Sequence, residues 1–154
     1  MLKIFLFFSI IILNAVAVNS NELVGEWYAY TESYTNGTTT SEEEHLHLNS
    51  DHTFNIRLFV SLEKEEAFIK DLRIEGSGIW KNRDNVLVMY IQKVEVPFAK
   101  EIYLISQESL RNLANNFKHK YENEPLKIVM IKSFTHVKLV IENEQLQETS
   151  YSRQ

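Results

Sequence analysis

Cysteine is absent from all 154 residues of this sequence. Its absence excludes thiol catalysis, thiolate metal sites, redox roles and a bacterial lipid anchor attached to cysteine. No disulfide can link distant parts of the chain, so the fold must depend on its hydrophobic core. A chain of this length can bury a core large enough to be stable on its own.

Excess positive charge is also missing. The chain has 16 lysines and arginines against 21 aspartates and glutamates, which gives a net charge of −5. A mildly acidic chain is a poor match for nucleic acid and for anionic membrane surfaces. No membrane span is expected either, because the apolar run from Ile4 to Leu13 is shorter than the roughly 20 residues a spanning helix needs.

Common catalytic motifs are missing as well. The sequence has no Gly-x-Ser-x-Gly elbow, no phosphate-binding loop and no His-Glu-x-x-His pair. Carboxylates gather at Glu42–Glu44 and Glu63–Glu66, and paired carboxylates can perform acid–base chemistry. These clusters fall at an expected strand start and hairpin tip, where solvation of the surface explains them. We therefore predict no catalytic residue and no cofactor, and favour a protein that is not an enzyme.

The first 17 residues have the pattern of a secretory signal peptide. Lys3 supplies the positive charge, an apolar run follows, and Ala15-Val16-Ala17 is a small-x-small cleavage pattern. An uncleaved membrane anchor is the alternative, which the short apolar run disfavours. We predict a signal peptide over residues 1–17, one domain over residues 18–154, and a secreted or periplasmic location.

The remaining chain is a series of short apolar runs separated by turn residues, which is typical of β-strands joined by hairpins. The connections are mostly short, so neighbouring strands should be antiparallel. We predict a mainly β protein, an antiparallel up-and-down β-barrel of about eight to nine strands with one α-helix. The expected strands are 23–31, 42–48, 53–62, 67–81, 86–96, 98–105, 126–134, 137–141 and 145–152.

One segment is predicted to be a long loop and another to be the helix. Ser33 to Ser41 is rich in Ser, Thr, Asn and Gly, which predicts either a lid over the barrel or an ordinary surface loop. It includes Asn36-Gly37-Thr38, a possible glycosylation acceptor. The helix is expected over Gln107 to Asn123, with Ser106 as its N-cap and Pro125 beyond its end. Its apolar stripe should cover one open end of the barrel, or act as a gate or a face for a partner.

Two Gly-x-Trp sequences support a family resemblance. Gly25-Glu26-Trp27-Tyr28, in the first expected strand, resembles the opening motif of lipocalins, and Gly78-Ile79-Trp80 resembles the mid-domain pattern of bacterial lipocalin-like proteins. The resemblance implies a calycin-type barrel that holds a small apolar ligand, with Arg153 packed over Trp27. The expected helix precedes the last three strands, whereas lipocalins place theirs after the barrel, so the resemblance is to a lipocalin-like protein.

Two functions from different classes follow. The first is an exported binder of a small hydrophobic or amphipathic ligand inside the barrel. The second is an interaction or inhibitor protein with a filled barrel, which contacts a protein partner through its loops or helix.

Two glycines two residues apart, Gly76 and Gly78, predict a bend that closes the barrel. The residues expected to line the interior or its closed end are Trp27, Phe54, Leu58, Ile74, Trp80, Met89 and Met130.

His45 and His47 are the only clustered histidines. They are two apart on one expected strand and therefore share a face, with Glu43 beside them, so they are weak candidates for zinc or copper ligands. Leu46 and Leu48 are expected on the inner face of the same strand. The histidines should therefore lie on the wet outer surface, and we predict no metal site.

Overall fold

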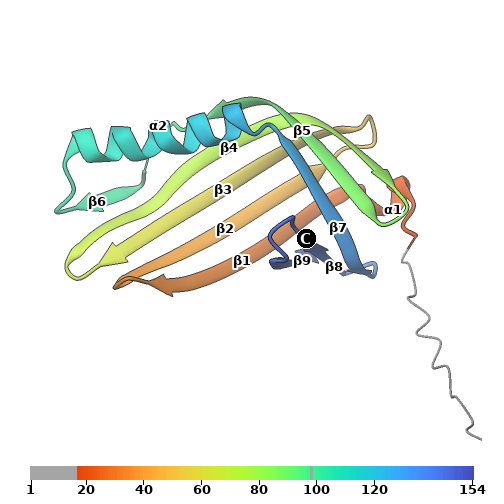
Figure 1. Cartoon of the computed structure of the whole chain (residues 1–154), viewed down its shortest axis with the longest axis horizontal. Helices are drawn as coiled ribbons and strands as arrows, with labels where there is room; N and C mark the ends of the chain where they lie inside the picture. The colour runs from red at the N-terminus through yellow and green to blue at the C-terminus, as the bar shows by residue number, and fades with distance from the viewer. Residues whose placement is uncertain (1–16, 98) are drawn as a thin grey trace, which may run out of the picture.

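The computed structural model describes residues 17–97 and 99–154, and these form a closed antiparallel β-barrel with a long helix beside it (Figure 1). The predicted signal peptide falls almost entirely on residues 1–16, outside the described residues, and stays a prediction. The elements are α1 (Ser20–Leu23), β1 (Gly25–Thr35), β2 (Thr38–Leu48), β3 (Thr53–Lys64), β4 (Ala67–Arg83), β5 (Val86–Glu95), β6 (Glu101–Tyr103), α2 (Gln107–Asn123), β7 (Leu126–Phe134), β8 (Lys138–Glu142) and β9 (Glu148–Arg153).

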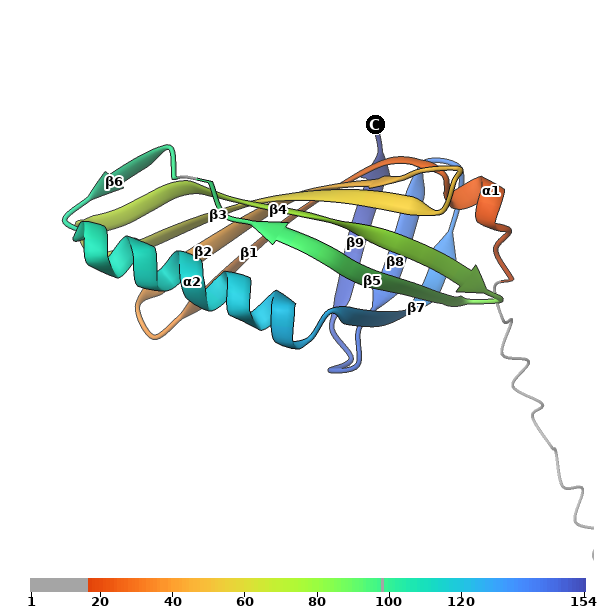
Figure 2. The same ribbon diagram turned by 90° about the horizontal axis from the view of Figure 1, so that it is seen from above.

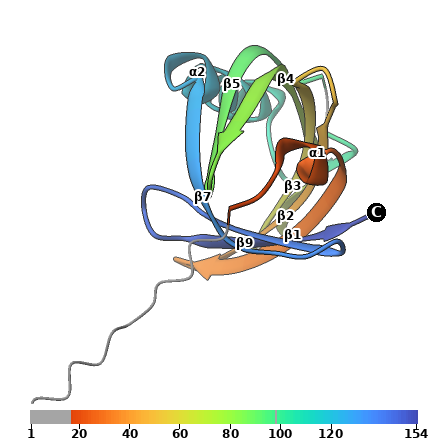
Figure 3. The same cartoon turned by 90° about the vertical axis from the view of Figure 1, so that its right-hand side faces the viewer.

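Eight of these strands close the barrel. Each of β1 to β4 pairs with the next strand, β5 pairs with β7, and β8 and β9 follow in order. The ring closes where β9 returns to β1, with Trp27 opposite Arg153 and Tyr28 opposite Ser152. The ninth strand, β6, pairs only with the start of β4, outside the ring. Figure 3 shows the strands around their common axis. The predicted fold class is confirmed.

The strands differ greatly in length, and this decides where α2 lies. β1 to β4 contain 11, 11, 12 and 17 residues, whereas β8 and β9 contain only 5 and 6. The first four strands therefore extend past the short ones as an open sheet, and α2 runs along this extension (Figures 1 and 2). Its half-buried apolar side chains pack against the core; they are Leu110, Leu113, Phe117 and Tyr121.

The helix itself agrees with the sequence prediction. It spans Gln107–Asn123, and the Ser106 side chain accepts a hydrogen bond from the backbone N–H of Ser109 at 3.0 Å. That bond satisfies one of the donors that a helix N-terminus leaves without a partner. Glu108 in the first turn and Lys120 in the last turn both complement the helix dipole.

One end of the barrel is densely packed around Trp27, which is almost completely buried. Its indole N–H donates to the carbonyl of Leu23 at 2.8 Å, so the short helix α1 is fastened across this end. The Arg153 guanidinium lies 4.2 Å from the Trp27 ring centroid, the packing that the lipocalin resemblance implies. It also donates to the carbonyls of Val24 at 2.8 Å and Glu22 at 2.6 Å. We call this the closed end.

Gly25 is required at the closed end. Its φ of +139° is one that residues with a side chain rarely adopt, and a Cβ there would lie 2.5 Å from Arg153 Nη1. The Gly-x-Trp pattern therefore has a direct cause, since the glycine lets the arginine reach across the chain to the tryptophan two residues later.

The bend predicted in β4 coincides with an irregularity in strand pairing. The register between β4 and β5 shifts between Ser77 and Gly78. At Gly78 the backbone of β5 comes so close that a Cβ would collide with the Tyr90 carbonyl oxygen and press on the Phe54 ring. β-Bulges of this kind increase local twist, which helps a sheet to curve into a barrel.

Three sequence predictions about elements are wrong. Ser33 to Ser41 is not a loop, because β1 and β2 continue through it and turn only at Asn36-Gly37. These two residues have φ of 51° and 76°, and Asn-Gly with two positive φ values is the preferred two-residue hairpin turn. Leu23 belongs to α1 rather than to a strand. Among the described residues of the expected strand at 98–105, which are 99–105, only Glu101–Tyr103 pairs with a neighbouring strand.

Candidate ligand-binding site

Above the closed end, the barrel contains an interior cavity of about 240 Å³. Most of the residues that line it are apolar, and these come from β3, β4, β5, β7 and β8. These apolar residues are Phe54, Ile56, Leu58, Ile74, Met89, Ile91, Val94, Val129 and Ile141. A smaller polar set lines the cavity as well, consisting of Glu44, Lys120, Tyr121, Lys127, Asn143 and Tyr151. The interior side chains thus leave a hollow of this size between them.

Most of the residues predicted to face the interior do so. Phe54, Leu58, Ile74 and Met89 are buried and line the cavity. Trp27 and Trp80 are also buried but do not line it; Trp80 donates its indole N–H to the carbonyl of Asn49 at 3.1 Å, outside the cavity. Whether any of these residues binds a ligand stays a prediction.

Met130 is the exception, and its predicted interior position is wrong. Its side chain is 45% exposed on the outer face of β7, while its neighbours Val129 and Ile131 are buried. β7 is apolar on both faces, with Ile128 also exposed outside, so the sequence alternation does not distinguish inside from outside. Moving the alternation by one residue exchanges the two faces of a strand.

Glu44 is one of several lining residues that the sequence analysis does not identify. It lines the cavity, and its Oε1 accepts a hydrogen bond of 2.6 Å from the hydroxyl of Tyr151, which is buried. From sequence, Glu44 and its neighbours are expected at a solvated strand start. The signal was present in the sequence, because Glu44 has the same strand parity as Leu46 and Leu48, which face the core.

The surroundings of Glu44 favour its neutral form. Loss of solvent raises the pKa of the Glu44 carboxyl, and the hydrogen bond from Tyr151 only partly opposes this. The nearby charge of Glu42 raises the pKa further, and His45 lowers it. Burial also raises the pKa of Tyr121 to about 12, with the negative charges of Glu44 and Glu42 adding to the effect.

We expect Glu44→Gln to change how stability depends on pH. A carboxyl whose pKa is raised in the folded protein stabilises the fold below its unfolded pKa, and this contribution is lost as pH rises through the folded pKa. The wild-type unfolding free energy should therefore fall relative to that of Glu44→Gln as pH rises above the ordinary pKa of a glutamate, because the folded-state pKa is raised. Urea unfolding at several pH values measures the difference. Parallel pH profiles for the two proteins would contradict the assignment.

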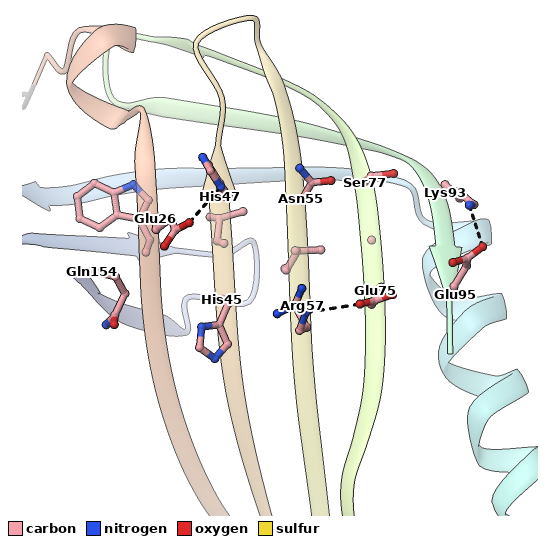
Figure 4. A pocket seen from close by; sticks show the side chains of 14 residues that line it. Glu26, His45, His47, Asn55, Arg57, Glu75, Ser77, Lys93, Glu95 and Gln154 are labelled. Carbon is pink, nitrogen blue, oxygen red and sulfur yellow. Dashed lines mark ion pairs between the residues drawn. The ribbon is translucent and has the colours of Figure 1, made fainter. Parts of the chain in front are cut away.

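A second hollow, of about 470 Å³, lies on the outer surface of β1 to β5 and contains the two clustered histidines (Figure 4). His45 and His47 point outward, as expected, and each pairs with one carboxylate. The distances are 2.8 Å from His45 Nε2 to Glu43 Oε1 and 3.4 Å from His47 Nδ1 to Glu26 Oε1. Among residues 17–97 and 99–154, no group of three metal-ligating side chains is close enough to hold an ion.

The other charges of the outer hollow also neutralise one another. Arg57 pairs with Glu75 at 3.5 Å, and Lys93 pairs with Glu95 at 2.8 Å (Figure 4). Exposed pairs of this kind contribute little energy. The outer hollow thus presents paired, solvated charges, whereas the interior cavity combines apolar walls with the half-buried carboxyl of Glu44.

Comparison with known proteins gives no family assignment: no protein-family model matches the chain, and a search of curated proteins found no match. In the part of the chain that the structure describes, no helix is both long and apolar enough to cross a membrane. The site must therefore be interpreted from its own geometry.

Proposed function

We propose that this chain is an exported, lipocalin-like protein that binds a small amphipathic molecule in its interior cavity. One observation carries the proposal: the barrel contains a hollow with mostly apolar walls and a few polar groups. Small-molecule sites in proteins have this composition, with apolar surface for affinity and a few polar groups for orientation. Export rests on the signal-peptide pattern, and the lipocalin likeness rests on the Gly-x-Trp sequences.

The size of the cavity limits the ligand. A volume of about 240 Å³ holds about eight water molecules at about 30 Å³ each. A ligand of about ten non-hydrogen atoms fills such a space, which is smaller than a typical drug-sized pocket. The alternative function, an interaction protein with a filled barrel, would require interior side chains to occupy this space.

Filling the cavity should abolish binding. We expect 1-octanol, a neutral probe of suitable size, to bind wild-type protein saturably in an NMR or calorimetric titration. Val129→Phe adds a ring to the cavity wall and should weaken octanol binding at least about tenfold, or about 1.4 kcal/mol. The matched control is Ile128→Phe, which places the same ring on the outer face of β7.

Equal octanol binding by the two variants would show that the probe binds elsewhere. Absence of saturable binding to the wild-type protein would favour the interaction protein. Circular dichroism and urea unfolding establish that both variants are folded before the affinities are compared.

A further inference from the structure

We infer that the polar end of the ligand is a cation, a primary ammonium or similar group, that pairs with Glu44 inside the barrel. The inference rests on the proposed function, because it specifies the chemistry of a ligand in the same cavity.

Hydrogen bonding leaves part of Glu44 without a partner. Its Oε1 accepts the Tyr151 hydroxyl, and within residues 17–97 and 99–154 no donor is recorded for Oε2. The hydroxyl of Tyr121 likewise has no hydrogen-bond partner among these residues, and both side chains line the cavity. A group that donates several hydrogen bonds could satisfy the carboxylate and the phenol together, and an ammonium donates three.

The charges around Glu44 also favour a cationic group on the ligand. In the part of the chain that is described, no lysine or arginine lies within ion-pair distance of the Glu44 carboxylate. Glu42 adds a second negative charge nearby, and His45 is already paired with Glu43 on the outer face. Partial loss of water disfavours the ionised form of the half-buried Glu44, and a bound cation would stabilise that form. The cavity therefore lacks a positive charge beside Glu44.

Lys120 and Lys127 also line the cavity and would favour an anionic ligand, but their surroundings differ from those of Glu44. Lys120 is exposed, and the Lys127 ammonium lies 5.5 Å from the centroid of the Tyr121 ring, so both have other favourable surroundings. A solvated ammonium gains less from a ligand than a carboxylate that has lost part of its water does. The half-buried Glu44 should therefore determine which ligand charge is preferred.

Three probes with the same eight-carbon chain test the inference: octylamine, 1-octanol and octanoate. Each is titrated calorimetrically at pH 7.5 into wild-type protein, Glu44→Gln and the control Glu43→Gln, whose side chain lies on the outer face of the same strand. Hydrogen bonds between charged groups are stronger than those between neutral groups, so octylamine should bind wild-type protein at least about tenfold more tightly than octanol. Glu44→Gln should abolish this advantage while leaving octanol affinity within about threefold, and Glu43→Gln should preserve it.

The possible outcomes distinguish a failure of the cation inference from a failure of the proposed ligand-binding function. If octanol binds but octylamine has no advantage, or if octanoate binds most tightly, the cation inference is overturned and the ligand-binding function stands. If none of the three probes binds the wild-type protein, the proposed function fails and the inference fails with it. The wild-type comparison does not depend on any variant being folded.

Discussion

Gly78→Ala should reduce the unfolding free energy by more than about 4 kcal/mol, or prevent folding altogether. The reason is that the methyl group would collide with the Tyr90 carbonyl oxygen of the neighbouring strand, which is backbone and cannot rotate away. It would also come within 2.9 Å of the Phe54 ring, which is buried at the same place. Relief requires β4 and β5 to separate, and this breaks the pairing at the bulge.

Two neighbouring substitutions provide controls for Gly78→Ala in urea unfolding followed by tryptophan fluorescence. Ser77→Ala, on the outer face of β4, should change stability by less than about 0.5 kcal/mol. At Gly76 a Cβ would lie 2.7 Å from Cγ2 of Ile56, a side chain that can adjust, so Gly76→Ala should cost about 1 to 3 kcal/mol. Equal effects at the two glycines would contradict the steric explanation.

Arg153→Met should cost about 3 kcal/mol, the second largest effect that we expect. The methionine keeps an apolar contact with Trp27 but removes the cation from the ring face. It also removes the three hydrogen bonds that the guanidinium donates to backbone carbonyls, those of Glu22, Val24 and His136. These bonds join both ends of the chain at the closed end of the barrel, so their loss should loosen α1 as well as β9.

Urea unfolding of three proteins separates the roles of charge and geometry. Arg153→Lys keeps the charge but cannot reach three carbonyls at once, so its stability should lie between wild type and Arg153→Met. Lys138→Met removes an exposed positive charge from the adjacent strand β8 and should have almost no effect. If Lys138→Met were as harmful as Arg153→Met, net charge rather than the specific contacts would explain the loss.

Local sequence signals predicted much of this fold because they act over short distances. Ser106 at the helix start and Pro125 beyond its end bracket α2, whose observed bounds equal the predicted ones. The alternation of leucine with polar residues in β2 placed His45 and His47 outside. Asn36-Gly37 carried an equally local signal for a hairpin, and composition alone led us to predict a loop there.

The candidate site was less predictable because it depends on distant partners. Glu44 is a site residue only because Tyr151 and Tyr121, far along the chain, face it across the cavity. No residue near Glu44 in the sequence indicates those partners, although Glu44 has the same strand parity as Leu46 and Leu48, which face the core. Met130 was misplaced for a related reason, since an apolar residue on an outer barrel face looks the same in sequence as one inside.

The closing contact between β1 and β9 also has consequences for how the molecule assembles. The strand that completes the ring, β9, ends at Arg153 and pairs with a strand that begins at Gly25. Pairings between residues so distant in sequence form slowly, since a long loop must be ordered first. Until β9 is in place, β1 and β8 keep unpaired edges, which are templates for joining another chain. Aggregation should therefore compete with folding chiefly in the interval before the final strand arrives.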